Sequence, residues 1–301
     1  TGSNILLAKP NLPRWDEKNF KAGQKLLLVS EQGLGDTLHF MRYVHILKQR
    51  GVDVSLCAQS KLHALIKASG IDSSPLTPEE ALDNQHGHWL PLLSLPRHLG
   101  VTPDNPIANN PYIKTPDSLI KSWKSRLSSE HRPIIGINWQ GNPDHEQSSS
   151  SGRSLPLEAF APIANIEDIT LLSLQKGFGS EQLDQCSFKN RFVQCQDQIN
   201  ETWNFLETAA IIANCDLVIT SDTSIAHLAG GMGQATWIIL KQIPEWRWGI
   251  HGETTFWYPS ARLFRQTEQG NWHAVTERVA TALKKSIEVS MPQETTRANP
   301  H

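Results

Sequence analysis

The sequence has no long hydrophobic run and no excess of charge, and each lack excludes a class of protein. No apolar stretch approaches the roughly 20 residues that a membrane-spanning helix needs, and the first residues lack the hydrophobic centre of a signal peptide. Lys and Arg total 28 against 30 Asp and Glu, so the formal net charge is only −2. Such a chain has no strong field that attracts nucleic acid or an anionic membrane. We therefore expect a soluble protein with no nucleic-acid partner.

Cysteine is also scarce, because only four residues, Cys57, Cys186, Cys195 and Cys215, occur and none form a CxxC pair. A chain of 301 residues can bury enough core to fold without disulfide bonds. This pattern predicts reduced thiols and a cytoplasmic location, although a bridge between Cys186 and Cys195 across a short hairpin stays open. No set of His, Cys, Asp and Glu has the spacing of a metal site, so we expect neither a metal nor another cofactor.

Short apolar runs alternate with segments of helical spacing, first in one half of the chain and then in the other. In the first half we expect strands at 25–30 and 52–57 and helices at 38–47 and 61–69. Residues 73–116 are rich in proline and predict irregular connections with one or two short strands.

A helix at 117–127 and a polar linker at 128–133 precede the second half. There the pattern predicts four strands alternating with four helices, at 134–139, 157–164, 169–174, 202–213, 216–220, 224–230, 235–240 and 272–287. This order predicts an α/β protein of two domains, 1–130 and 131–301, each with a parallel sheet, and a disordered tail after about residue 290. Ligands of such folds bind at the carboxyl ends of the strands, here in the cleft between the domains.

The turn after the first strand, Gly33-Leu34-Gly35-Asp36, is the first candidate site. Its two glycines allow a sharp turn and the close approach of a ligand. Asp36 either caps the following helix or presents a carboxylate to the cleft as a general base. A dinucleotide fingerprint would need a small residue in place of Leu38 and an acid at the end of the second strand, where Cys57 stands. The turn therefore does not indicate a dehydrogenase.

The junction between a buried strand and the next helix is the second candidate, because Ser221, Asp222, Thr223 and Ser224 stand there in a row. Helix N-termini carry unpaired N–H groups and a partial positive charge, and they bind anions. Thr223 and Ser224 would add hydroxyl donors, and His227, one turn further on, could donate to a phosphate. The simpler reading is capping by Ser221 or Asp222 beside a buried histidine. Five such residues together favour phosphate binding.

Three further groups of residues are predicted to border the same cleft. Arg153 either binds phosphate oxygens through its planar guanidinium or is a solvated charge in a serine-rich loop. Arg247 and Trp248 lie in an aromatic cluster that either stacks on a sugar or packs between the domains. The loops that follow the strands at 134–139 and 169–174 add the remaining candidates, Gln140, Gly141, Asn142, Gln175 and Lys176.

Together these motifs resemble those of the heptosyltransferase-like glycosyltransferases of family 9. The resemblance rests on Gly33–Thr37 in the first half and on Ser221–Gly230 in the second. A third segment, Glu245–Gln266, is similar to the glycosyltransferase-like domains that follow tetratricopeptide repeats in bacterial proteins. The resemblance covers about residues 25–285, and it departs from the heptosyltransferase pattern at Ser224, where glycine is usual.

The resemblance implies a GT-B-like fold, in which two Rossmann-like domains with parallel sheets face each other across a cleft. It implies a metal-independent, inverting transfer of a sugar from a nucleotide-diphosphate donor in the second domain to an acceptor hydroxyl held by the first. Asp36 matches the base, and the donor diphosphate would lie at Asp222, Thr223, Ser224 and His227. The acceptor side of the cleft would be bordered by Gly33, Gly35, Thr37, Arg247 and Trp248.

The implied partners are therefore a nucleotide-sugar donor and an acceptor that is a glycan, a lipid-linked molecule or a protein. Tetratricopeptide repeats upstream in a longer chain are a candidate partner as well. Two alternatives stay open: a binding module that keeps the fold without turnover, and a nucleotide-sugar epimerase. Product analysis without an acceptor would distinguish an epimerase from a transferase.

Overall fold

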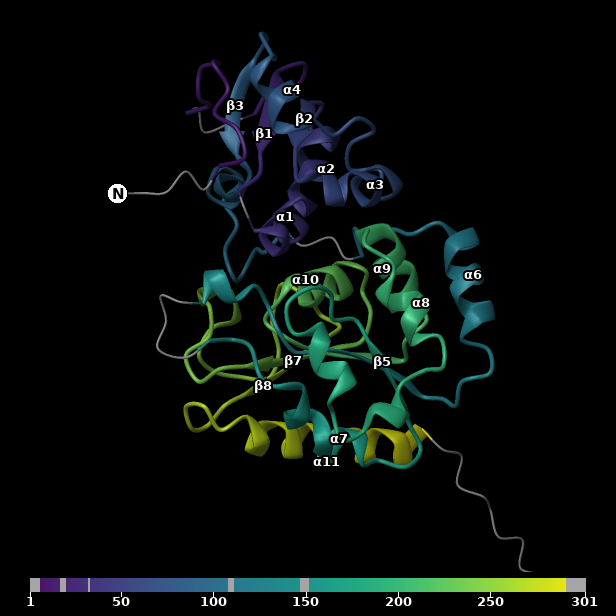
Figure 1. Cartoon of the computed structure of the whole chain (residues 1–301). Helices are drawn as coiled ribbons and strands as arrows, with labels where there is room; N and C mark the ends of the chain where they lie inside the picture. The colour runs from purple at the N-terminus through teal and green to yellow at the C-terminus, as the bar shows by residue number, and fades with distance from the viewer. Residues whose placement is uncertain (1–5, 17–19, 32, 108–110, 147–151, 291–301) are drawn as a thin grey trace, which may run out of the picture.

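The computed structural model describes residues 6–16, 20–31, 33–107, 111–146 and 152–290, which form two α/β lobes (Figure 1). The first lobe holds a three-stranded parallel sheet in the order β2-β1-β3, made of β1 (Lys25–Val29), β2 (Asp53–Cys57) and β3 (His88–Pro91). Its helices are α1 (Leu34–Phe40), α2 (Arg42–Gln49), α3 (Ser60–Ala68), α4 (Pro78–Leu82) and α5 (Leu95–Leu99).

The second lobe holds a five-stranded parallel sheet in the order β5-β4-β6-β7-β8. Its strands are β4 (Ile134–Asn138), β5 (Thr170–Ser173), β6 (Leu217–Ser221), β7 (Thr236–Leu240) and β8 (Ala261–Arg265). Its helices are α6 (Asp117–Arg126), α7 (Ala161–Ala164), α8 (Gln196–Asn200), α9 (Phe205–Ile212), α10 (Ser224–Gly231) and α11 (Trp272–Ser290). The predicted α/β class with two parallel sheets is confirmed.

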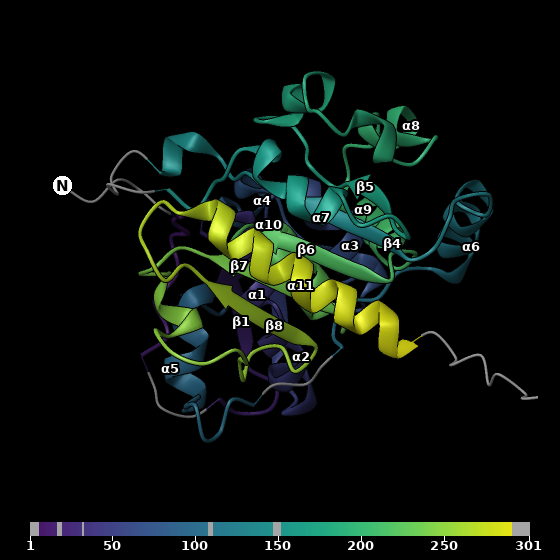
Figure 2. The same cartoon turned by 90° about the horizontal axis from the view of Figure 1, so that it is seen from below.

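Helices cover both faces of the larger sheet, so its central strands are buried throughout. Every residue of β4 and β6 is buried, as expected of parallel strands between two helical layers. Helix α11 crosses one face of the sheet, which Figure 2 shows from below. Helices α9 and α10 lie on the opposite face, towards the first lobe (Figure 1). Helix α10 is thereby held between its own sheet and α1 of the other lobe.

Small residues allow the two lobes to approach closely at α1 and α10. A Cβ atom built on Gly35 of α1 would lie 2.9 Å from the His227 ring of α10. One built on Gly230 of α10 would lie 2.6 Å from the ring of Tyr258. Gly35 therefore lets α1 approach the first turn of α10 across the lobes, whereas Gly230, near the C-terminal end of α10, makes room for Tyr258 of the same lobe.

A buried arginine also joins the lobes. Arg42 of α2 is only 2% exposed and donates to the backbone oxygens of His39 and Trp257, both at 2.8 Å. Its third partner is the hydroxyl of Tyr112 at 3.3 Å. The backbone N–H of Tyr112 in turn donates to Gly231 of α10. The N–H groups of this buried guanidinium thus find carbonyl and hydroxyl acceptors in both lobes.

The largest differences from the sequence-based expectation lie in residues 73–116, whose described part contains α4 and α5 besides the strand β3. Helix α4 begins with a capping box between Thr77 and Glu80, with proline at its first position, a helix signal within the proline-rich segment. Strand β8 was also not expected. The predicted helix at 38–47 is in fact two helices, because α1 begins at Leu34 and ends at Phe40, and α2 begins after Met41.

Both Cys186 and Cys195 are free thiols, so the alternative of a bridge between them is wrong. The tail after residue 290, predicted to be disordered, lies outside the described residues, as does the part of the serine-rich loop at 147–151. The domain division at residue 130 stays a prediction. Helix α6, before that point, packs beside α9 of the second lobe, with the Trp123 indole donating to Glu207. Among the described helices, none is long and apolar enough to cross a membrane.

Candidate active site

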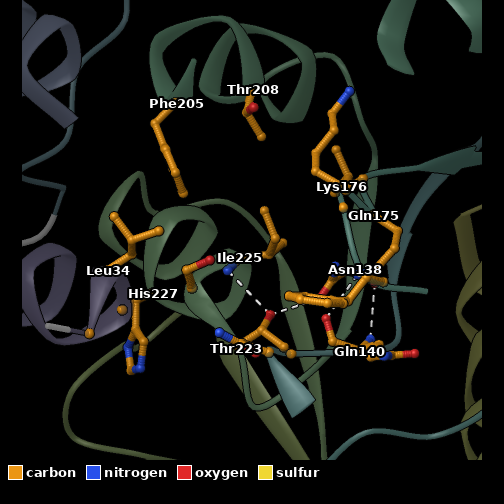
Figure 3. A pocket seen from close by; sticks show the side chains of 18 of the residues that line it. Leu34, Asn138, Gln140, Gln175, Lys176, Phe205, Thr208, Thr223, Ile225 and His227 are labelled. Atoms are coloured by element: carbon orange, nitrogen blue, oxygen red, sulfur yellow. Dashed lines mark hydrogen bonds between the residues drawn. The ribbon is translucent and has the colours of Figure 1, made fainter. Parts of the chain in front are cut away.

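A cleft of about 1160 Å³ lies between the lobes, beside the N-terminal turns of α1 and α10 (Figure 3). Its lining includes residues that follow the carboxyl ends of β4, β5 and β6, where ligands of parallel α/β folds bind. Leu34, Phe205, Thr208 and Ile225 point into the open space from α1, α9 and α10 (Figure 3). The cleft therefore combines apolar walls with polar groups at strand ends and helix starts.

Asp36 stands in the first turn of α1 and faces the cleft. Gly33 is the N-cap of α1 and no side-chain cap is present, so Asp36 does not act as the capping residue. The carboxyl group instead folds back over Gly33, because a Cβ built there would lie 2.4 Å from Oδ2. Glycine at position 33 thus makes room for the Asp36 carboxylate, whose side chain is 28% exposed.

Arg247 holds Asp36 from the opposite lobe. It lies in the short 3-10 turn Trp246–Trp248, and its Nη2 donates to Asp36 Oδ1 at 2.7 Å. Its Nε donates to Glu245 at 2.8 Å, and its Nη1 lies 3.3 Å from Nε2 of His227. Burial acts to lower the pKa of Arg247, but the charges of Asp36 and Glu245 outweigh burial and raise it. Arg247 is therefore a permanent cation in the lining of the cleft.

Two buried histidines continue this chain of contacts. The hydroxyl of Tyr258 lies 2.9 Å from Nδ1 of His227 and 2.8 Å from Nδ1 of His39. Burial and the charges of Arg247 and Arg42 lower the pKa of His227 well below its usual value. Burial and the charge of Arg42 do the same for the pKa of His39. Both rings are therefore neutral at pH 7.

The donor and acceptor roles along the chain follow from Arg247, which can only donate. Nε2 of His227 then accepts, its Nδ1–H donates to Tyr258, and Tyr258 donates to Nδ1 of His39. The remaining N–H of His39, on Nε2, has no partner among the described residues. In this arrangement His227 has no hydrogen to offer a phosphate, although a phosphate donor is what the sequence predicted.

The N-cap of α10 is neither of the two residues that the alternative reading named. Thr223 is the N-cap, and its hydroxyl accepts from the N–H of Ile225 while it donates to Asn138 Oδ1 at 2.7 Å. Capping by Ser221 or Asp222 is therefore not what the structure shows. Because the Thr223 hydroxyl is committed to these bonds, Ser224 is the hydroxyl of this turn that lines the cleft without a described partner.

Asp222 lines the cleft beside this helix start and is 7% exposed. Burial raises the pKa of its carboxyl group, while the Trp248 indole and the charges of Arg153 and Arg247 act in the opposite sense. A carboxylate placed here would repel an anion bound at α10. Its environment therefore favours the protonated form of Asp222 once such an anion is bound.

Gln175 joins the loops that follow β4 and β5 through hydrogen bonds. Its Oε1 accepts from Asn138 Nδ2 at 2.8 Å and from the backbone N–H of Gln140 at 3.0 Å. Its amide nitrogen donates to the backbone oxygens of Gln140 and Phe178. Gln175 is therefore occupied in shaping the cleft, and its neighbours Gln140, Gly141 and Asn142 line it.

Two further cations border the cleft. Lys176 donates to the backbone oxygen of Ile199, and burial lowers its pKa to about 8. Arg153 lies 3.5 Å from Glu146 and its side chain is 34% exposed. Arg153 thus lines the cleft, although the serine-rich segment before it lies outside the described residues.

Three of the predicted residues do not line the cleft. The hydroxyl of Thr37 donates to Gln59 at 2.9 Å, and Ser221 is fully buried in β6. Trp248 is buried and stacks on His227, with ring centroids 5.4 Å apart, so packing explains it better than contact with a sugar. The other predicted site residues all border the cleft.

Sequence reasoning missed an aromatic wall on the side of the cleft near α9. Phe178 and Trp203 are more than half exposed and line the cleft together with Phe205. Nothing in the sequence distinguishes these three from ordinary packing residues. Glu245 was also missed, although its position two residues before Arg247 could have indicated an anchor.

Among the described residues, no group of three or more His, Cys, Asp and Glu could hold a metal ion. Basic side chains supply positive charge in the cleft. Lys61, Arg153, Lys176 and Arg247 all line it.

The chain is similar in sequence to protein FlbA of Caulobacter vibrioides, with 22% identity over 299 residues. The match spans 90% of this chain and 48% of that protein, so the chain spans about half the length of the curated relative that it matches. A scan against protein-family models found no match.

Solved structures of glycosyltransferases share the fold. ADP-heptose LPS heptosyltransferase II of E. coli matches with a TM-score of 0.60 at 12% identity, over 87% of this chain and 99% of that one. The glycosyl transferase family 9 protein of Veillonella parvula matches with a TM-score of 0.53 at 12% identity, over 93% and 94%. TibC of enterotoxigenic E. coli, an iron-containing dodecameric glycosyltransferase, reaches 0.51 at 11% identity, over 91% and 78%. The predicted GT-B-like fold is thus confirmed.

Proposed function

We propose that the chain is a glycosyltransferase that moves a sugar from a nucleotide-diphosphate donor to an acceptor hydroxyl. The observation that carries the proposal is the meeting of Asp36 and the first turn of α10 at one cleft, where Arg247 joins them. The shared fold with heptosyltransferases supports it, and one neighbour, TibC, has been solved in complex with ADP-D-β-D-heptose.

The transfer would be a direct, inverting displacement. Asp36 takes the proton of the acceptor hydroxyl, whose oxygen attacks the anomeric carbon. The bond from that carbon to the diphosphate breaks, and the diphosphate leaves with the electron pair. The N-terminus of α10, with its partial positive charge, would face the leaving group together with Arg153 and Arg247. These fixed charges lead us to propose a reaction that needs no metal ion.

The donor and acceptor occupy opposite lobes in this proposal. The donor would lie against the second lobe, between the aromatic wall of Phe178, Trp203 and Phe205 and the start of α10. The acceptor, a glycan, a lipid-linked molecule or a protein, would approach Asp36 from the first lobe. We further propose a cytoplasmic location, which the four free thiols support, and recruitment of the acceptor by a tetratricopeptide module.

Calorimetric titration with a panel of nucleotide diphosphates and their hexose and heptose derivatives tests the donor site. At least one of them should bind, and Ser224→Asp should weaken its binding roughly tenfold or more, because the new carboxylate repels the diphosphate. An acid in the first turn suits the helix itself, so the variant should fold. Ser125→Asp, which adds the same charge on the exposed face of α6, is the matched control.

The same titration in the presence of a chelator should give unchanged affinities. Absence of binding by every member of the panel would overturn the proposed function, and equal losses in the two aspartate variants would overturn the assignment of the diphosphate to α10.

A non-catalytic binding module is the second candidate, and one observation favours it. The carboxylate of Asp36 is engaged by Arg247, so the proposed base is not free in this state. A module of this kind would bind the donor in the same titration, but it would neither transfer nor hydrolyse the sugar with any acceptor offered.

A further inference from the structure

Two of the three side-chain nitrogens of Arg247 donate to carboxylates, one in its own lobe and one in the other. Nε donates to Glu245, which comes from the same short turn and also accepts from the backbone N–H of Arg247. Nη2 donates to Asp36, which belongs to the other lobe and stands 211 positions away in the sequence. Glu245 therefore anchors the guanidinium in the second lobe, and the bond to Asp36 is the one that can break without disturbing the turn.

The remaining nitrogen of Arg247 points to the helix that would hold the diphosphate. Nη1 lies 3.3 Å from Nε2 of His227, which stands in α10. The imidazole is neutral, and a hydrogen bond between a cation and a neutral ring at this length is weaker than one to an anionic oxygen. A phosphate oxygen near the start of α10 would therefore be the better partner for Nη1.

We propose that Arg247 is a donor-sensing residue that exchanges Asp36 for the diphosphate of the bound nucleotide-sugar. Nε stays on Glu245 while the two Nη groups move to phosphate oxygens, and Oδ1 of Asp36 becomes free to accept the acceptor proton. This inference rests on the proposed function. A diphosphate carries more charge than one carboxylate and suits the planar guanidinium, so the exchange is favourable only once the donor has bound.

The exchange makes the order of binding part of the mechanism. Without donor, Oδ1 of the base is engaged by Arg247 and does not face the acceptor hydroxyl. With donor, the same guanidinium stabilises the leaving group, and the base faces the acceptor hydroxyl. Because Asp36 and the diphosphate compete for one cation, each weakens the hold of the other on Arg247.

This competition predicts an unusual effect of removing the base. Asp36→Asn keeps the shape of the side chain but loses its charge, so it should tighten the binding of a nucleotide diphosphate by about fivefold. Arg247→Gln should weaken that binding roughly tenfold or more, because the phosphate loses a charge-assisted donor. In the Arg247→Gln background, Asp36→Asn should have almost no effect.

Calorimetry on the four proteins of this double-mutant cycle is the test, with ADP, GDP and UDP as probes and the tightest of them carried through the cycle. Glu253→Gln, which removes one charge from the exposed Arg262–Glu253 pair, is the matched control and should leave the affinity unchanged. Tightening by Asp36→Asn that disappears without Arg247 supports the exchange.

Two results would overturn the inference while the proposed function stands. One is an unchanged affinity in Asp36→Asn. The other is equal tightening with and without Arg247, which would indicate simple repulsion between Asp36 and the diphosphate. If none of the three nucleotides binds the unaltered protein, the proposed function fails first, and the inference falls with it.

Discussion

The protonation states of His39 and His227, at and behind the cleft, depend on burial and on charged neighbours from both lobes. His39 and His227 are neutral because burial and nearby guanidinium groups make protonation costly. Their shared partner Tyr258 can donate to only one of them, so the position of each hydrogen is fixed by the chain that starts at Arg247. The same burial keeps a small set of polar groups oriented at the edge of the cleft.

The buried His39 should make stability depend on pH. The unfolded chain binds a proton to this histidine below about pH 6.5, whereas the folded protein does not, so folding stability falls as the pH falls through that range. His39→Asn removes this dependence, and the slope of unfolding free energy against pH between about 6 and 5 should become shallower by up to ~1.4 kcal/mol per pH unit. Chemical denaturation at a series of pH values measures it.

Other titratable groups make stability change with pH in the opposite sense, so the test compares His39→Asn with the wild type. Burial raises the pKa of Glu31 to about 7, so the folded protein binds this proton at a higher pH than the unfolded chain does. Glu31 therefore adds stability as the pH falls from about 7 towards the usual pKa of a glutamate. Its contribution is common to both proteins and cancels in the difference. His86→Asn, at an exposed site, should leave the slope as it is. Equal slopes in the wild type and His39→Asn would contradict the assignment.

At the scale of elements, the contact between α1 and α10 is the feature that forms the site. Gly230 and Gly231 of α10 lie against the rings of Tyr258 and Tyr112, where an added Cβ atom would lie 2.6 and 2.9 Å from the nearest tyrosine atoms, and the lack of a side chain allows this close approach. The same approach places Gly35 against His227 and brings Asp36 within reach of Arg247. The geometry of the cleft therefore depends on residues that contact no ligand.

Gly230→Ala should disturb the packing of α10 against Tyr258. The added methyl group would lie 2.6 Å from two carbon atoms of the Tyr258 ring. We expect a loss of about 1–3 kcal/mol in unfolding free energy from overpacking, reduced by the roughly 1 kcal/mol that alanine gains over glycine in a helix. Urea denaturation measures the balance.

The Tyr258→Ala background serves as the control for this change, because it removes the ring that the new methyl group meets. There Gly230→Ala should be neutral or stabilising. The same loss in both backgrounds would show that the ring is not the cause.

For the whole molecule, the sequence predicted the features that depend on the local pattern of residues. The strands of both sheets other than β3 and β8, the glycine turn before Asp36 and the helix start at Ser224 all follow from apolar periodicity and cap residues. Asp36 and Arg247 were both chosen as candidates, but their ion pair could not be predicted, because it joins residues 211 positions apart. The bond between His39 and Tyr258 spans 219 positions and was missed for the same reason.

The alternative of capping by Ser221 or Asp222 named the wrong N-cap for a related reason. Ser221, Asp222 and Thr223 are all good caps, and the sequence does not show which of them leaves the strand last. The bond from Thr223 to Asn138, a residue of the neighbouring strand β4, settles the choice in favour of Thr223. Pairing between distant strands therefore decides a detail that looks local.

The turnover of Asp36→Asn, measured with a donor that calorimetry has shown to bind and with its acceptor, tests the central role given to the cleft most directly. The variant keeps the size of the side chain, so folding and donor binding should persist while kcat falls by about 10²- to 10⁴-fold, the usual contribution of a general base. A rate near that of the unaltered protein would contradict the assignment of Asp36 as the group that activates the acceptor.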